Sequence, residues 1–102
     1  MHNDEMPNLV TKTFPTTEGN LERALAANAV LGNLWSETEI RGDAALFLGL
    51  VVADMMADGM QLKSMAKNLG VCEETIHASL ARLRRKAHRR RKFDDAGFEL
   101  FG

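Results

Sequence analysis

A chain of 102 residues, 45% of them hydrophobic, is long enough for one small helical core and too apolar to be wholly disordered. Its formal net charge of −1 conceals an uneven distribution. Residues 82–92 hold eight of the thirteen Lys and Arg and no acid, whereas residues 93–102 hold three acids and no base. Such a distribution steers one face of the protein toward phosphate groups and keeps the rest away from them.

The single cysteine, Cys72, excludes an internal disulfide and fits a reducing compartment. The N-terminus lacks a charged-then-apolar leader, and the apolar run near residue 50 is too short to span a bilayer. We therefore expect a cytoplasmic protein that does not enter a membrane.

Residues 1–16 contain both prolines and no helical period, so we expect a flexible arm ahead of a single helical domain at 17–92. Thr17 is a suitable N-cap for a first helix, which is predicted to run from about Glu18 to Leu34. That segment is rich in alanine and carries an apolar stripe, which fits either core packing or a dimer seam. Trp35, the only tryptophan, is expected to anchor it against the next helix.

Ser36 and Glu39 have the spacing of a capping box, and Gly42-Asp43 predicts a bend and a second helix start. Residues 44–57 are apolar nearly all round, which is typical of a helix at the centre of a bundle or of one covered partly by a second subunit. Gly49 either weakens this helix or lets a neighbour come close. The methionines at 55, 56, 60 and 65 are expected to be core filler, with an adaptable binding patch as the alternative.

Residues 60–86 have the pattern of a helix-turn-helix. Gly70 stands where the first helix should end, since a left-handed backbone costs glycine little, and small Ala66 stands where two crossing helices must approach closely. The inward face recurs at three- and four-residue steps, at Met65, Leu69, Val71, Ile76 and Leu80. This spacing sets a second helix, beginning near Cys72 or Glu73, across the first and free to enter a major groove. The alternative is an ordinary helical hairpin.

The string from Gly59 to Leu80 resembles the helix-turn-helix of LuxR-type transcriptional regulators and of the fourth conserved region of sigma factors. It matches their L-G-[IV]-x-x-x-T-[IV]-x-x-x-L core and the Gly-apolar pair ahead of a small Ala, at Gly59, Met60, Ala66, Leu69, Gly70, Val71, Thr75, Ile76 and Leu80. The resemblance covers about residues 44–86 and implies a helical scaffold followed by a DNA-reading helix. The chain departs from these families at Glu73-Glu74, because two acids there would repel phosphates.

The residues expected to contact double-stranded DNA lie on both helices of this motif. Lys63 and Lys67 would contact the DNA backbone, and the base-facing positions would be Glu74, Thr75, His77 and Ala78. The basic extension at 82–92 would bind phosphates through Arg82, Arg84, Arg85, Lys86, Arg89, Arg90 and Arg91. Arginine-rich helices also bind structured RNA, so RNA is an alternative partner.

Residues 93–102 form an acidic-aromatic tail that contains Phe93, Phe98 and Phe101. The tail is either idle, docked on the core or on a second protomer, or in contact with another protein such as RNA polymerase. Its negative charge would also shield the basic run when no DNA is present.

No pattern in the chain indicates catalysis, a cofactor or a metal. Cys72, His77 and His88 lack the closed spacing of a zinc site, and Glu73 and Glu74 oppose a redox role for Cys72.

We therefore expect an all-α bundle of four to five helices with a long basic C-terminal helix, acting as a homodimeric, sequence-specific DNA-binding regulator. The rival hypothesis is a protein-interaction module with the same fold that binds and inhibits a regulator or an RNA polymerase subunit.

Overall fold

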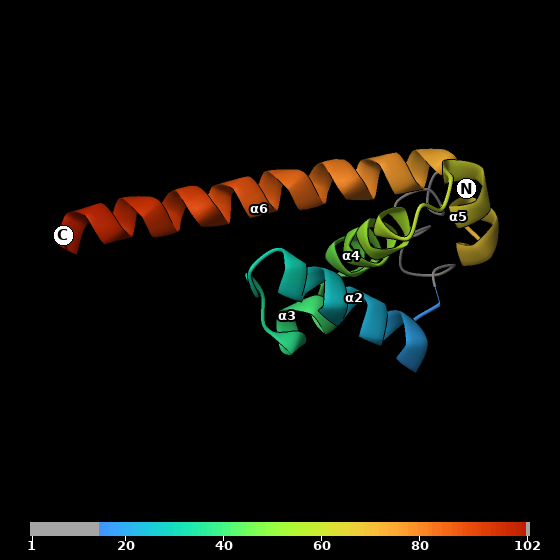
Figure 1. Cartoon of the computed structure of the whole chain (residues 1–102), viewed down its shortest axis with the longest axis horizontal. Coiled ribbons are helices and arrows are strands. Elements are labelled where there is room, and N and C mark those ends of the chain that lie inside the picture. Colours follow the sequence, from blue (N-terminus) through green and yellow to red (C-terminus); the bar gives the residue numbers. More distant parts are fainter. Residues whose placement is uncertain (1–14, 102) are drawn as a thin grey trace, which may run out of the picture.

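Five helices make up the part of the chain that the computed structural model describes, which is residues 15–101, with side chains described for residues 15–91 (Figure 1). No strand occurs among these residues, so the predicted all-α fold class is confirmed. The helices, in chain order, are α2 (Glu18–Val30), α3 (Glu37–Gly42), α4 (Ala44–Ala57), α5 (Leu62–Leu69) and α6 (Glu73–Phe101). Most of the predicted flexible arm at 1–16 lies outside the described residues.

The predicted start signals of the first three helices are confirmed. The Thr17 hydroxyl oxygen accepts the backbone N–H of Asn20 at 3.3 Å. Ser36 and Glu39 form a capping box in which each side chain accepts the other residue's backbone N–H. The Asp43 carboxylate accepts the backbone N–H of Leu46 at 3.1 Å and caps α4. Each cap satisfies an amide that the first helical turn leaves without a partner.

Helix α2 ends at Val30, four residues earlier than the predicted end at Leu34. The chain leaves the helix through Gly32 at φ 96° and Asn33 at φ 55°, two residues that tolerate the left-handed region better than others. This turn brings Trp35 back against α2, where the Asn28 side chain donates to the Trp35 carbonyl at 2.8 Å and accepts its backbone N–H at 3.3 Å. The expected anchoring role of Trp35 is confirmed, and both residues are buried.

Helix α4 lies at the centre of the bundle, between α2 on one side and α6 on the other (Figure 1). Its central segment from Leu46 to Val52 is buried in the single hydrophobic core. Asp54 is its charged interior residue, and the Arg23 guanidinium of α2 lies 3.5 Å from it. No helix in the described part of the chain is both long and apolar enough to cross a membrane.

Gly49 is the point where α4 and α6 cross. A Cβ atom built at Gly49 would lie 2.9 Å from the Ser79 carbonyl oxygen and 3.1 Å from the Leu83 Cβ atom, both on α6. Because a real Cβ cannot approach a backbone oxygen so closely, only glycine permits this separation of the two helices. The sequence left two roles open for Gly49, and the structure shows the close approach.

Helices α5 and α6 are joined by a short turn. Gly70 adopts the predicted left-handed conformation at φ 70° and ψ 29°. Met65 and Leu69 of α5 and Ile76 and Leu80 of α6 are buried, and Val71 between them packs against the same core. The inward face predicted for this pair of helices is therefore present.

Helix α6 has 29 residues and continues through the predicted boundary at Lys92. Residues 93–101 are therefore not a separate tail in the backbone, because they extend the same helix to Phe101. In Figure 1 this last part of α6 projects past α2 and α3.

Substitution Gly49→Ala should lower the free energy of unfolding by about 1–3 kcal/mol, since the added methyl group forces α4 and α6 apart along their buried contact. Urea denaturation followed by circular dichroism at 222 nm measures the change.

Gly19→Ala is the matched control, because Gly19 is an exposed helical glycine whose new Cβ would meet only the Thr17 hydroxyl oxygen at 4.0 Å. It should leave stability unchanged or raise it by up to about 1 kcal/mol, as expected for alanine in a helix. Equal effects at the two positions would show that the α4–α6 crossing is not under steric constraint.

Candidate nucleic-acid interface

The residues predicted to contact DNA differ in how far the structure exposes them. Thr75 is buried, Lys86 is half-buried, and the other eleven are exposed. The exposed residues are Lys63, Lys67, Glu74, His77, Ala78, Arg82, Arg84, Arg85, Arg89, Arg90 and Arg91. Exposure alone does not make a residue available, because several of these side chains have partners within the protein.

Thr75 does not lie where the sequence placed it. Its side chain is only 8% exposed, and its hydroxyl lies 3.0 Å from the Cys72 Sγ atom at the start of α6. The hydroxyl therefore faces the protein and cannot reach a base edge. Helical spacing predicts that Ile76 faces inward, but it does not give the width of the buried stripe, and Thr75 lies within that stripe.

One flank of α6 faces acids at the two ends of α3. The Lys86 ammonium donates to the Asp43 carboxylate, Arg82 lies 4.0 Å from the same carboxylate, and Arg90 donates to Glu39 at 3.1 Å. Asp43 and Glu39 also cap the helices around them. Three of the basic residues expected to bind phosphate, Arg82, Lys86 and Arg90, therefore also hold α6 against α3.

The electrostatics of this contact favour the ionised acids. Partial burial alone would raise the pKa of Asp43, but the hydrogen bonds from Lys86 and from the Leu46 backbone N–H outweigh it, and the pKa lies below its usual value. The pKa of Glu39 is lowered chiefly by the backbone N–H of Ser36 and then by the hydrogen bond from Arg90. Both carboxylates therefore bind the basic flank most strongly in the charged form.

A second group of bases has no such partner. Arg85 and Arg89 on α6 and Lys63 and Lys67 on α5 are exposed, and none forms an ion pair with any residue that the structure describes. Arg89 also borders a hollow of ≈ 240 Å³ beside Trp35, together with Lys86 and Arg90. These four side chains are the bases most available to a polyanion.

The start of α6 has the opposite charge. Glu73 and Glu74 are exposed in the first turn, as their sequence position indicated. His77 and Ala78, one turn later, are exposed as well. A nucleic acid approaching this end would meet two carboxylates before it reaches Arg85.

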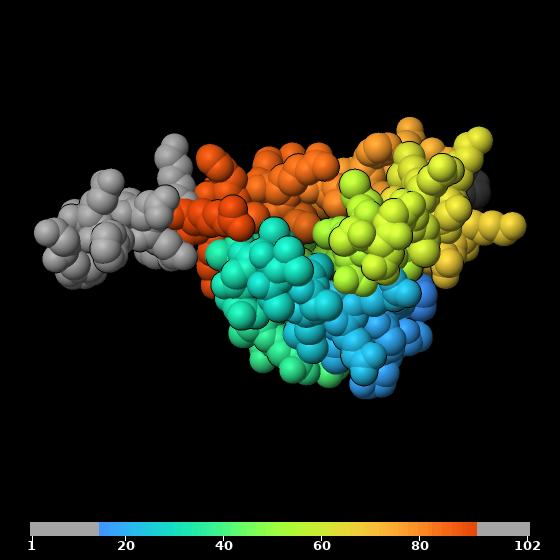
Figure 2. Space-filling model, viewed as in Figure 1, coloured from blue at the N-terminus to red at the C-terminus, as the bar shows by residue number. Residues whose placement is uncertain are grey.

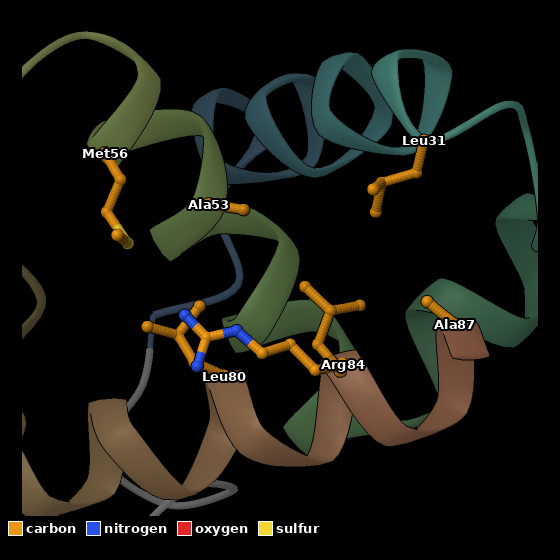
Figure 3. Close-up of a pocket in the computed structure, with 7 residues that line it drawn as sticks. Leu31, Ala53, Met56, Leu80, Arg84 and Ala87 are labelled. Atoms are coloured by element: carbon orange, nitrogen blue, oxygen red, sulfur yellow. The ribbon is translucent and has the colours of Figure 1, made fainter. Parts of the chain in front are cut away.

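The remaining two arginines border an apolar groove that sequence analysis missed. The groove lies between the end of α2, α4 and α6 and has a volume of ≈ 250 Å³ (Figure 3). It is lined by Leu31, Ala53, Met56, Leu80, Leu83, Arg84 and Ala87. Arg91 donates to the Leu31 carbonyl at 3.3 Å, near one end of it.

A smaller hollow of ≈ 90 Å³ shares Leu31 and Ala53 with this groove and is also bordered by Val30. Val30 is 86% exposed and Met56 45% exposed, the only large hydrophobic side chains so exposed in the described part of the chain. Met55 and Met65 lie in the core, as expected of core filler, whereas Met56 lies at the groove. The sequence contains one sign of this surface, the valine that ends α2. In the sequence alone, that valine cannot be distinguished from a core residue.

Cys72 is exposed at the start of α6. The hydrogen bond from the Thr75 hydroxyl is the main cause that lowers the pKa of its thiol. The backbone N–H groups of Thr75 and Glu74 act in the same direction, and burial and the Glu74 charge oppose it. Among the described residues, no three His, Cys, Asp or Glu side chains gather closely enough to hold a metal ion.

Comparison with known proteins gave no match: no family model fits the chain, and no curated protein and no solved structure is similar to it.

Asp43→Asn should lower the free energy of unfolding at neutral pH by about 1 kcal/mol, because asparagine keeps the helix cap but loses the charge that binds Lys86. The folded-state pKa of Asp43 is depressed, so its contribution is present above the unfolded value of about 4 and disappears as pH falls through the folded value. Wild type and variant should converge in acid. Urea unfolding between about pH 2.5 and 7 measures this, and Glu37→Gln, which removes an exposed carboxylate paired with Arg41, is the control.

Thr75→Val should raise the pKa of the Cys72 thiol, since valine keeps the buried shape of threonine and removes its hydroxyl. The midpoint of the pH dependence of iodoacetamide alkylation should move upward. Ser79→Ala, which removes a buried hydroxyl with no hydrogen-bond partner among the described residues, should leave the midpoint in place. An unchanged midpoint in Thr75→Val would show that the hydroxyl does not stabilise the thiolate.

Proposed function

We propose that this chain is a sequence-specific DNA-binding regulator of transcription that acts in the cytoplasm, without catalysis, by inserting α6 of its helix-turn-helix into the major groove. The observation that carries the proposal is the set of exposed basic side chains on α5 and α6 that have no acid partner among the described residues and lie away from the apolar groove, namely Lys63, Lys67, Arg85 and Arg89. Lys86 and Arg90, in contrast, form ion pairs with Asp43 and Glu39.

Some of the proposed contacts are with the DNA backbone and others are with the nucleobases. Lys63 and Lys67 contact phosphates beside the groove, and Arg85 and Arg89 contact phosphates further along α6. Glu74, His77 and Ala78 are the exposed positions nearest the start of α6 and face the base edges. A glutamate in this place accepts a hydrogen bond from the amino group of cytosine, which gives the acidic residue a role in sequence reading.

The ion pairs with α3 have a supporting role in this proposal. Lys86 and Arg90 bind Asp43 and Glu39, so the middle of α6 is fixed on the core while its outer side stays open. A recognition helix held in this way loses little conformational freedom on binding. Two copies related by a twofold axis would prefer a partly palindromic site.

The groove between α2, α4 and α6 favours a second candidate function. An apolar groove with an exposed methionine in its lining, next to a hollow bordered by an exposed valine, is typical of a protein-interaction surface. Glu73 and Glu74 weaken the attraction to phosphate. In this alternative the chain binds and inhibits a regulator or an RNA polymerase subunit. Salt separates the two functions, since phosphate binding weakens steeply as salt rises and apolar binding does not.

Arg85→Gln and Arg89→Gln should each reduce the slope of log affinity against log salt by about 1, because each removes one phosphate contact. The measurement is fluorescence anisotropy of a labelled duplex selected from a random DNA pool with the wild-type protein. Arg41→Gln, which removes one exposed arginine from α3, should leave the slope unchanged.

A wild-type affinity that does not depend on salt, or the absence of any bound duplex after selection, would contradict DNA binding and support the interaction module. Equal slopes in wild type and both variants would contradict the assignment of Arg85 and Arg89.

A further inference from the structure

The groove between α2, α4 and α6 presents apolar side chains that nothing in the described part of the chain covers. In Figure 3, Leu31, the C-cap residue of α2, and Met56 and Ala53 of α4 border one side, and Leu80 and Ala87 of α6 border the other. Arg84 extends along α6 at the edge of the groove. The groove therefore combines an apolar floor with cations, Arg84 in its lining and Arg91 near its end at Leu31.

The chain itself contains a segment of complementary composition. Residues 93–101, FDDAGFELF, hold three phenylalanines and a leucine together with three acids and no base. Phe93, Leu100 and Phe101 are separated by seven and eight residues, which is two turns, so they lie on one face of a helix. The backbone of this segment is the last part of α6, which projects past α2 and α3 in Figure 1.

The segment cannot reach the groove of its own copy. Helix α6 is continuous from Glu73 to Phe101, and Ala87 of the groove and Phe98 lie on it about 16 Å apart along the axis, at 1.5 Å per residue. A straight helix cannot fold back on itself. The occupant therefore has to come from a second molecule.

We propose that the groove of one copy binds residues 93–101 of a second copy, and that the exchange is reciprocal. Phe93, Leu100 and Phe101 occupy the apolar floor, and the acids of the segment approach Arg84 and Arg91. Reciprocal exchange gives a closed, twofold dimer in which both grooves and both segments are used, so that no further copy can add. Arg85 and Arg89 do not line the groove and stay open on the outer side of α6.

This inference rests on the homodimer of the proposed function and names its interface, but it does not require DNA. It is tested without nucleic acid, so its failure is distinct from the failure of DNA binding. A dimer of this kind would exist in a protein-interaction module as well.

The test uses two full-length variants that damage opposite halves of the interface. Leu100→Ser with Phe101→Ser removes two apolar anchors of the segment, and Met56→Glu places a like charge in the groove against the acids of the segment. Each variant alone has no intact groove–segment pair. Each should show a dimer dissociation constant raised by at least about tenfold in sedimentation equilibrium, the effect expected when an interface anchor is lost.

A mixture of the two variants discriminates this interface from others. In the mixed dimer, the intact segment of the groove variant meets the intact groove of the segment variant, so one pair is restored. Mixing should therefore yield heterodimers tighter than either homodimer, whereas a different interface predicts no gain. Ala26→Glu, which adds a carboxylate at an exposed position of α2 outside the groove, should dimerise like wild type.

Three outcomes would overturn the proposal. These are a wild-type protein that stays monomeric at about 100 µM, variants that dimerise as wild type does, and a mixture no tighter than its components. If the wild-type protein stays monomeric, the occupant of the groove would have to be a protein other than this chain. Helical content by circular dichroism checks that each variant is folded.

Discussion

At Gly49, α4 and α6 come closer than two helices with side chains at their crossing can. The Ser79 carbonyl oxygen occupies the space that a Cβ atom would need, and Leu83 lies beside it. This contact fixes the first half of a 29-residue helix on the central helix of the bundle. The position of every side chain further along α6 follows, including the bases that meet α3 and those that remain in solvent. It also sets the height of α6 above the end of α2, and hence the width of the apolar groove between them.

The basic residues of α6 differ in the side of the helix that they occupy as well as in their position along it. On the flank toward α3, Lys86 and Arg90 meet carboxylates that also cap helices, so Asp43 and Glu39 each serve a helix cap and an ion pair. On the outer side, Arg85 and Arg89 meet no acid within the described residues. A basic run that looks uniform in the sequence is therefore divided in the folded protein between residues that form ion pairs with the core and residues that have no acid partner. The second set is the one to which we assign the proposed DNA contact.

Much of the fold was predictable because its signals are local. Thr17, Ser36, Asp43 and Gly70 each act on backbone groups within a few residues, and each was found where its spacing indicated. Long-range pairs were not predictable, because nothing in the sequence indicates that Lys86 will lie beside Asp43 rather than beside another acid. The burial of Thr75 was missed for a related reason. Helical spacing locates the centre of a buried stripe, but the neighbouring helix decides how wide that stripe is.

Because α6 is one continuous helix, the number of residues in it determines where its later residues lie. A single residue inserted after Ala87 would advance everything beyond it by about 1.5 Å and turn it by about 100° about the axis. The crossing at Gly49 would be unaffected, since Ser79 and Leu83 precede the insertion. Arg90 and Arg91, in contrast, would turn away from Glu39 and from the Leu31 carbonyl. The number of residues in α6, and not only their composition, therefore decides which contacts form beyond Ala87.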